Sequence, residues 1–213
     1  MKECDYIEFV VMRHGQSTAD VAKPKRFEGQ ADNPLTETGL DQARLAAEWI
    51  ATHRPPQRII SSPLRRAKKT AEEVAIRVAL DIEIDAGLLE RNNGALAGLT
   101  ENEAEAQNLL RPDGYLPHET VPCGETLIEL RARAETFWSR ALSQSKAGQR
   151  ILIVSHGQMI GMLFRSFLKL PMDESVRLQT GDTGIHCWRV DAKGQQIVFT
   201  NSRVHLETGK AIR

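Results

Sequence analysis

The sequence predicts an α/β fold, a three-layer sandwich in which a mainly parallel central sheet is flanked by helices on both faces. Two observations support this prediction. First, residues 9–12, preceded by Ile7, and residues 151–154 are apolar runs with the length and β-branched content of buried parallel strands. Second, segments with apolar residues at helical spacing alternate along the chain with further short strands, as in a sheet covered on both faces.

Local signals define the elements of the first half of the chain. Thr36 is the expected N-cap of a helix, because apolar residues follow it at helical spacing. Residues 58–62 are expected to form a strand, and Pro63 to open the next helix at a favoured first-turn position. Residues 81–85 alternate polar and apolar side chains like a strand. The polar stretch 18–34 is expected to be a loop, and at this length a functional one.

Glycine and proline mark the connections in the second half. A glycine-bearing loop covers residues 88–98, and a Pro/Gly-rich connection precedes a long helix. No internal repeat, low-complexity tract or interdomain linker is evident, so residues 1–213 are interpreted as one domain. The helices expected in this half are residues 101–110, 125–143 and 158–168, and the closing strands are residues 186–190 and 196–200.

The composition argues against nucleic acid and membrane partners. Lys plus Arg equals Asp plus Glu at 28 each, so no net field attracts polyanions, and any anion site must be built locally. The first residues lack the basic-then-apolar pattern of a signal peptide, and no apolar run approaches a membrane span. Three widely spaced cysteines, Cys4, Cys123 and Cys187, fit a reducing compartment rather than a disulfide framework or zinc site. We therefore expect a cytoplasmic protein.

Both apolar strands end in a histidine followed by a glycine. The first leads into Arg13, His14 and Gly15, and the second leads through Ser155 into His156 and Gly157. The carboxyl ends of parallel strands are where open α/β sheets place their ligands. Glycine at such a point allows a ligand to approach the backbone closely. The pairing of the two His-Gly ends therefore predicts a functional site.

These residue types suit displacement at a phosphomonoester. The reaction needs a nucleophile, charge stabilisation around the phosphoryl oxygens and a proton for the leaving group. Neutral His14 can attack phosphorus, while Arg13 and Arg66 can present planar, permanently charged guanidinium groups to the phosphoryl oxygens. His156 can donate a further hydrogen bond, preferably as imidazolium. Glu90 is the candidate acid, because a carboxyl beside a phosphate dianion is expected to have a raised pKa.

Several motifs occur in a recognisable order along nearly the whole chain. Together they resemble the histidine phosphatase superfamily, the phosphoglycerate mutase-like proteins, and this resemblance implies the same α/β fold. The motifs are Arg13-His14-Gly15, Gly29 with residues 32–39, residues 61–67 with Arg66 as the matching arginine, Leu89-Glu90-Arg91 with Gly94 and Gly98, Gly124-Glu125-Thr126, and residues 154–157.

The resemblance implies a set of site residues and no cofactor. The catalytic residues would be Arg13, His14, Arg66, Glu90 and His156. Substrate contacts would come from Gly15, Gln16, Ser17, Asp20, Glu28, Gly29, Asn93, Gly157 and Gln158. A metal ion on the histidines and Glu90 is the alternative, but two flanking arginines would repel a cation, so no metal is expected.

Asp20 is a departure from the family pattern. The family commonly has an asparagine six residues after the first histidine, donating its amide to the phosphate, where this chain has an aspartate. An ionised carboxylate would repel a phosphate dianion. Asp20 could be protonated when substrate binds, pair with Arg13 or Lys23, or turn away; pairing or turning away is favoured, because residues 18–20 begin a polar loop.

The expected function is hydrolysis of small phosphomonoesters through a phosphohistidine. A phosphoglycerate mutase is the alternative within the family, and a silent relative that only binds phosphorylated ligands is the alternative outside catalysis. Mutases of the family carry a longer insertion rich in basic residues, whereas residues 99–122 are short and contain Arg111 as their single arginine. The candidate leaving groups, which include sugar phosphates, phosphoglycerates, phosphoserine, nucleotides and ribazole phosphate, stay open, as does the oligomeric state.

Other conspicuous side chains have simpler interpretations. His186 and His205 are expected to be hydrogen-bonded polar residues rather than ligands. Trp49, Trp138 and Trp188 are expected to be packing residues. Arg91, next to the proposed acid, either contacts substrate or is structural.

Overall fold

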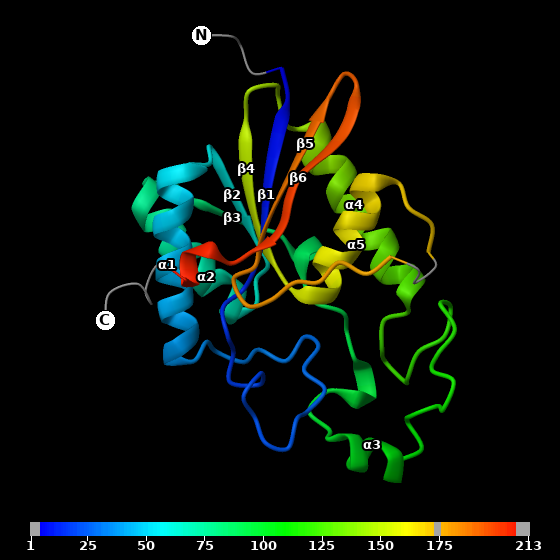
Figure 1. Cartoon of the computed structure of the whole chain (residues 1–213). Helices are drawn as coiled ribbons and strands as arrows, with labels where there is room; N and C mark the ends of the chain where they lie inside the picture. Colours follow the sequence, from blue (N-terminus) through cyan, green and yellow to red (C-terminus); the bar gives the residue numbers. More distant parts are fainter. Residues whose placement is uncertain (1–4, 173–175, 208–213) are drawn as a thin grey trace.

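The computed structural model describes residues 5–172 and 176–207, so the prediction for Cys4 and that for the first residues lie outside the described part. One six-stranded sheet forms the centre of the molecule (Figure 1). Its order, β3-β2-β4-β1-β5-β6, places the two apolar strands of the sequence side by side in the middle. The strands are β1 (Ile7–Arg13), β2 (Arg58–Ser61), β3 (Ile82–Ile84), β4 (Arg150–Ser155), β5 (Ile185–Asp191) and β6 (Gly194–Ser202).

Helices cover both faces of the sheet, which confirms the predicted three-layer architecture (Figure 1). Helices α1 and α2 lie against one face, and α4 and α5 lie against the other, while α3 lies away from the sheet beside the loops. None of the helices within the described residues is long and apolar enough to span a bilayer. The helices are α1 (Glu37–His53), α2 (Arg65–Val78), α3 (Glu101–Ala106), α4 (Leu127–Ser143) and α5 (Gly157–Leu168).

The apolar run of β1 is explained by burial on both of its faces. Successive side chains of a strand point to opposite sides, so both sides must be apolar when helices cover both. Phe9 and Val11 pack in the core beneath α4 and α5, whereas Val10 and Met12 pack in the core beneath α1 and α2. All four are fully buried. The strand therefore anchors both cores at once.

The direction of the last two strands was not predicted. Strands β1, β2, β3 and β4 are parallel to one another, which confirms a mainly parallel sheet, but β5 runs antiparallel to both β1 and β6. Ile185 at the start of β5 pairs with Met12 near the end of β1. The turn that enters β5 therefore lies at the carboxyl end of β1, beside the predicted site.

Helix ends differ from the sequence prediction where tertiary contacts determine them. Pro63 does not open α2, which begins at Arg65 with Leu64 as its N-cap. The carboxylate of Asp32, from the loop before α1, accepts the Arg65 backbone N–H at 2.6 Å and so satisfies this helix start. Helix α3 ends at Ala106 rather than at residue 110. Thr36 caps α1 as predicted, accepting from Gly39 N.

Loop 18–34 is joined through its backbone to the segment that begins at Gly98. Phe27 N donates to Leu99 O at 2.9 Å, and Gly98 N donates to Phe27 O at 2.8 Å. Arg26 and Thr100 form an isolated antiparallel bridge. Loop 18–34 and the segment after residue 98 therefore form one unit at the carboxyl end of the sheet (Figure 1).

His186, His205 and the three tryptophans have structural contacts. His186 binds Thr180 and accepts a hydrogen bond from Asn201 N at 3.2 Å, and His205 binds Thr183 at 2.9 Å. Both predictions of ordinary polar residues are confirmed. Trp138 and Trp188 are buried in the core beneath α4 and α5, and Trp49 packs against the core beneath α1 and α2, as expected.

A buried carboxylate lies at the opposite end of the sheet from the predicted site. Glu8 of β1 is 1% exposed and is contacted by Arg54, Arg150 and Arg189, the last at 2.8 Å. Burial acts to raise its pKa, but hydrogen bonds from Arg150 and Arg189 outweigh burial and hold the pKa below the ordinary value. Glu8 therefore ties strands β1, β4 and β5 together through charge-assisted hydrogen bonds.

Replacing this carboxylate is expected to destabilise the fold in a pH-dependent way. Because the pKa of Glu8 is lower in the folded state, its stabilising effect is complete above the unfolded value near 4.5 and declines as pH falls. Glu8→Gln should lower the free energy of unfolding by about 2 kcal/mol at pH 7. Denaturant titrations at pH 7 and pH 3.5 should show this difference shrinking at low pH; a constant difference would contradict the ion-pair explanation.

Candidate active site

The register between β1 and β4 brings the two histidines together. Arg13 pairs with Ser155 across the parallel strands, so the residues that follow each strand end lie beside each other. The rings of His14 and His156 have centroids 5.1 Å apart. Both side chains are buried. The predicted meeting of the two His-Gly ends is therefore present in the structure.

The hydrogen bonds of His14 select one tautomer of its ring. Nδ1 lies 2.7 Å from the carbonyl oxygen of Gly15, so Nδ1 carries the proton and donates it. Arg66 Nε–H donates to Nε2 at 3.2 Å, which requires a lone pair on Nε2. Burial, followed by the charges of Arg13 and Arg66, lowers the pKa of His14 to about 3. Near neutral pH, His14 therefore has an unprotonated Nε2 with a lone pair available for attack.

His156 is also neutral in the free protein, and its action as an imidazolium toward a bound phosphate stays a prediction. Burial lowers the pKa of His156 well below its ordinary value, and the neighbouring His14, Arg66 and Arg13 add to this effect. Its Nε2 shares a hydrogen bond with the hydroxyl of Ser62 at 2.7 Å. Its buried Nδ1 has no hydrogen-bond partner within the described residues. An anion beside this ring would favour its protonation and supply the missing partner.

Arg66 comes from α2 and is oriented by the loop that precedes α1. The side chain is 1% exposed, and its terminal nitrogens donate to Ala31 O at 2.6 Å and to Gly29 O at 2.9 Å. The carboxylate of Glu28 lies 3.5 Å from Nη1 of Arg66. Gly29 adopts a φ of 53°, a left-handed conformation that favours glycine and turns its carbonyl oxygen toward the arginine. The loop therefore fixes the guanidinium against His14.

Arg13 is paired with two carboxylates. Its Nη2 lies 2.9 Å from Asp20 Oδ1, and its Nη1 lies 3.3 Å from Asp182 Oδ1. Nη1 also donates to Thr180 O at 3.4 Å. The buried Nε of Arg13 has no partner among residues 5–172 and 176–207. Arg13 therefore keeps one unused donor beside the histidines.

The structure shows Asp20 paired with Arg13, one of the three possibilities that the sequence left open. Its second oxygen, Oδ2, accepts from both the backbone N–H and the hydroxyl of Ser17, each at 2.7 Å. Burial acts to raise the pKa of Asp20, but the Ser17 hydrogen bonds and the charge of Arg13 hold it below the ordinary value. Asp20 is therefore ionised, and protonation of this group is disfavoured.

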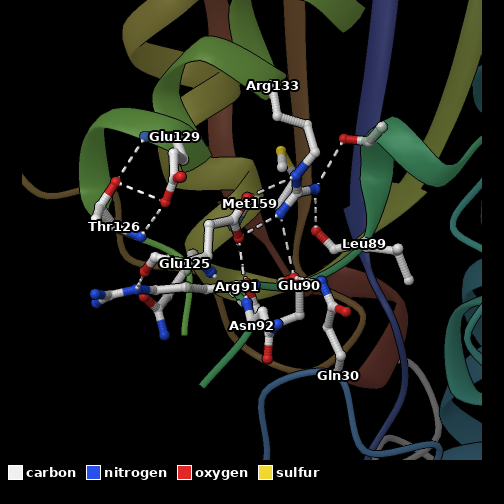
Figure 2. Close-up of polar contacts among 12 residues, drawn as sticks. Gln30, Leu89, Glu90, Arg91, Asn92, Glu125, Thr126, Glu129, Arg133 and Met159 are labelled. Carbon is white, nitrogen blue, oxygen red and sulfur yellow. Dashed lines mark hydrogen bonds and ion pairs between the residues drawn. The ribbon is translucent and has the colours of Figure 1, made fainter. Parts of the chain in front are cut away.

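Glu90 caps the first turn of α5 (Figure 2). Its carboxylate accepts the backbone N–H groups of Gln158 and Met159, both at 3.2 Å, and that of Arg91 at 2.9 Å. His156, the N-cap residue of α5, makes no side-chain capping bond itself. Burial raises the pKa of Glu90, although these three amides act in the opposite direction. A raised pKa agrees with the property expected of an acid at this position.

Two predicted glycines have different surroundings. A Cβ on Gly15 would lie 2.4 Å from the carbonyl oxygen of Gly39, so Gly15 is required for close packing against α1. This corrects the expectation that Gly15 leaves room for a ligand. A Cβ on Gly157 would meet no described atom within 4 Å, so space is open there.

The other predicted substrate contacts are mostly engaged within the protein. Gln16 Oε1 accepts from the Thr36 hydroxyl at 2.9 Å, which ties this side chain to the start of α1. Ser17 is fully buried, and its hydroxyl lies 3.1 Å from Glu28 as well as contacting Asp20. Asn93 packs closely against Gly29. Their roles toward a substrate stay predictions.

Sequence reasoning missed Asp182, Thr180 and Ser62. Asp182 and Thr180 precede β5, and they reach Arg13 because β5 runs antiparallel to β1. Gly181 and Gly184, on either side of Asp182, indicate a tight turn. Turn composition alone does not place that turn at the site. Ser62 follows β2, the strand next to β4, and therefore reaches His156. All three residues reach the site because of the order and direction of the strands in the sheet, which the sequence does not specify.

The fold and the site define an α/β protein with a buried histidine pair and two arginines at the carboxyl ends of its central strands. The family model of the histidine phosphatase superfamily (branch 1) matches residues 9–203. The chain belongs to this superfamily, which confirms the resemblance seen in its motifs.

The relatives and solved structures that this chain resembles carry different names. A protein of Photorhabdus laumondii named "Probable phosphoglycerate mutase GpmB" is 32% identical over 95% of this chain and 96% of its own length. A mycobacterial glucosyl-3-phosphoglycerate phosphatase is 26% identical, with a TM-score of 0.75 over 92% of this chain and 99% of that one. The phosphoserine phosphatase of Entamoeba histolytica shares the fold, with a TM-score of 0.76 at 23% identity, over 94% of this chain and 99% of that one.

Replacing Asp20 tests whether its carboxylate competes with substrate for Arg13. Asp20→Asn keeps the size of the side chain and removes a negative charge from the site, so catalytic efficiency should be kept or improved, chiefly through a lower KM. The pH optimum should not move much, because the pKa of Asp20 already lies below its ordinary value. Steady-state kinetics between pH 5 and 8 measure both quantities. A large loss of activity would show that the carboxylate has a positive role toward substrate.

Proposed function

We propose that this chain is a phosphomonoester hydrolase that acts through a phosphohistidine on His14. The observation that carries the proposal is the state of His14, a buried neutral imidazole whose unprotonated Nε2 faces the guanidinium of Arg66 at 3.2 Å. Two buried nitrogens, Arg13 Nε and His156 Nδ1, lack partners within the described residues. Buried polar groups are normally hydrogen-bonded, so this arrangement suits an anion such as a phosphoryl group.

In the first step, His14 Nε2 forms a bond to phosphorus while the bond from phosphorus to the leaving oxygen breaks. The Arg66 Nε–H, which donates to the Nε2 lone pair in the free protein, would instead donate its hydrogen bond to a phosphoryl oxygen and keep its proton. Glu90 would give its proton to the leaving oxygen, which departs as an alcohol. The hydrogen bond from Nδ1 to Gly15 O holds the ring orientation and stabilises the charge that develops on the imidazole.

In the second step, water attacks phosphorus and the bond to His14 Nε2 breaks. Glu90, now a carboxylate, would take the proton from the attacking water, since the residue that gives a proton in one direction can accept it in the next step. The products are inorganic phosphate, an alcohol and the original enzyme. No oxidant, cofactor or metal ion is needed for the balance of this cycle.

Hydrolysis is favoured over mutase chemistry by the segment beside the site. A mutase must hold a second acidic group of its substrate, which calls for cations near the leaving group. Arg111, the single arginine of residues 99–122, is paired with Glu119 at 2.7 Å and stacks over Tyr115. The names of the sequence relatives support the mutase alternative, so the two activities are to be separated by experiment.

A cavity of about 440 Å³ lies beside residues 88–98, the loop that carries Glu90 and is called the acid loop. Its lining begins at Arg91, the residue after Glu90, and we propose that it receives the leaving group. Arg91 and Asn93 of the acid loop line one part, and the segment from Asp113 to Val121 lines much of the rest. Polar and apolar side chains are mixed there, including Tyr115 and Leu127. We therefore propose a small organic phosphate with both hydroxyl and apolar surface as the substrate class.

The deciding experiment is a hydrolysis screen over sugar phosphates, phosphoglycerates, phosphoserine and nucleotides. Phosphate release is measured with and without a chelator, and 3-phosphoglycerate is also assayed for conversion into 2-phosphoglycerate. Hydrolysis that survives chelation supports the proposal. Isomerisation without net phosphate release would establish the mutase, loss of activity restored by a divalent ion would overturn the metal-free mechanism, and binding without turnover would identify a silent relative.

His14→Ala is expected to abolish turnover and phosphoenzyme formation. The substitution removes the only nitrogen proposed to attack phosphorus, while the strands on either side retain their packing. Wild-type protein quenched during turnover should carry acid-labile phosphate, and the variant should carry none. Circular dichroism and thermal unfolding check that the variant is folded. Labelling of His14→Ala at the wild-type level would refute the assignment.

Glu90→Gln is expected to discriminate between leaving groups. An alkyl phosphate needs a proton on its departing oxygen and should be slowed by about 100-fold or more, whereas 4-nitrophenyl phosphate, with a good leaving group, should be slowed far less. The ratio of kcat/KM for the two esters is the measurement. Equal slowing of both esters would indicate that Glu90 binds substrate or supports the fold instead of acting as the acid.

A further inference from the structure

We propose that Arg133 of α4 is a positioning residue for Glu90, acting together with Glu125. The inference rests on the proposed role of Glu90 as leaving-group acid. Arg133 donates hydrogen bonds to the main-chain oxygens of Gly87, Leu89 and Glu90 and to the Glu125 carboxylate (Figure 2). Its effect on the reaction would therefore pass through the backbone that carries Glu90.

The guanidinium of Arg133 uses every one of its five N–H groups. Nε donates to Glu125 Oε1 at 2.9 Å, and Nη2 donates to Glu125 Oε2 at 2.8 Å and to Glu90 O at 3.2 Å. Nη1 donates to Leu89 O at 2.6 Å and to Gly87 O at 3.1 Å. A rigid fork with five donors matches this set of acceptors, whereas a lysine ammonium has only three.

Glu125 holds the other side of the same loop. Its Oε2 accepts from Asn92 N at 3.2 Å, and its own carbonyl oxygen accepts from Arg91 Nε at 2.9 Å. Glu125 N in turn donates to Asn92 O at 2.8 Å. The residues before and after Glu90 are therefore both held by Arg133 and Glu125, which Figure 2 shows next to Glu90.

The Arg133–Glu125 ion pair is held by helix α4, which is packed against the core. Glu125 immediately precedes the N-cap of α4, where Thr126 and Glu129 form a capping box with bonds of 3.1 and 2.8 Å. Arg133 lies two turns further along the same helix, whose buried face includes Leu130, Ala134 and Phe137 in the core. Groups built on a packed helix are held more precisely than groups on a loop.

This arrangement positions the acid without adding a free positive charge beside it. An unpaired arginine next to Glu90 would favour the carboxylate and weaken the acid. Because Glu125 neutralises Arg133, the guanidinium can orient the loop while the raised pKa of Glu90 is retained. Displacement of a reacting group by about 1 Å can cost on the order of 100-fold in rate, so loosening the loop should be visible in kinetics.

Arg133→Lys tests the proposal, with Arg131→Lys as the matched control. Arg131 lies on the same helix, pairs with Glu135 and also donates to a main-chain oxygen, that of Arg165, but it faces α5 away from the acid loop. The two esters used for Glu90→Gln, an alkyl phosphate and 4-nitrophenyl phosphate, are assayed for kcat with each variant. Thermal unfolding is recorded alongside, so that a general loss of stability is separated from a change in leaving-group dependence.

Arg133→Lys should slow the alkyl phosphate by about 10- to 100-fold and 4-nitrophenyl phosphate much less, as Glu90→Gln does. Combining Arg133→Lys with Glu90→Gln should slow the alkyl phosphate no further than Glu90→Gln alone, because both act through one group. Arg131→Lys should leave the ratio of the two rates unchanged. If Arg133→Lys does not fold, Glu125→Gln gives the same test, since it removes the charge that orients the guanidinium.

The outcomes separate this inference from the proposed function. If Glu90→Gln discriminates between the esters while Arg133→Lys and Glu125→Gln slow both equally, the positioning role is wrong and the acid role stands. If Glu90→Gln itself does not discriminate, the acid role fails, and with it the basis of this inference. The specific role of Arg133 would also be overturned if Arg131→Lys changed the ratio of the alkyl phosphate and 4-nitrophenyl phosphate rates as much as Arg133→Lys does.

Discussion

The site depends on the parallel register between β1 and β4. Because Arg13 pairs with Ser155, the chain leaves both strands at the same level, and His14 and His156 become neighbours. The same strands are buried on both faces, so a shift of one residue would exchange their core-facing side chains and break both cores. The packing that stabilises the sheet therefore also fixes the histidine pair.

Charge balance is the second organising constraint. Three buried or partly buried arginines around the histidines are each matched by carboxylates: Arg13 by Asp20 and Asp182, Arg66 by Glu28, and Arg133 by Glu125. Unpaired charges in such surroundings would be costly. The internal carboxylates also compete with an incoming phosphate for Arg13 and Arg66, so binding must exchange one set of ion pairs for another. Arg133, which is not proposed to meet the phosphate, keeps its partner throughout.

The sequence was sufficient for the features that local chemistry determines. Apolar runs identified β1 and β4, and the residues at their ends located the histidines and Arg13, because sheet geometry forces those ends together. Asp182 and Arg133 were not found, since their contacts join segments far apart in the chain and follow from strand direction and helix packing. The start of α2 was misplaced for the same reason: Asp32, more than thirty residues earlier in the sequence, accepts the N–H of Arg65, the first residue of the helix. The periodicity of apolar residues gives no information about contacts between residues so far apart in the sequence.

Glu90 shows why burial and hydrogen bonding must be considered together at this site. Burial favours the protonated carboxyl, whereas the amides at the start of α5 favour the carboxylate. An acid must be protonated before the reaction, yet its conjugate base must be stabilised once the proton has left. Partial burial supplies the first condition, and the helix N-terminus supplies the second, because its N–H groups and dipole stabilise negative charge. The same carboxylate is then the base required for attack by water, so one side chain held in one place can serve both halves of a hydrolytic cycle.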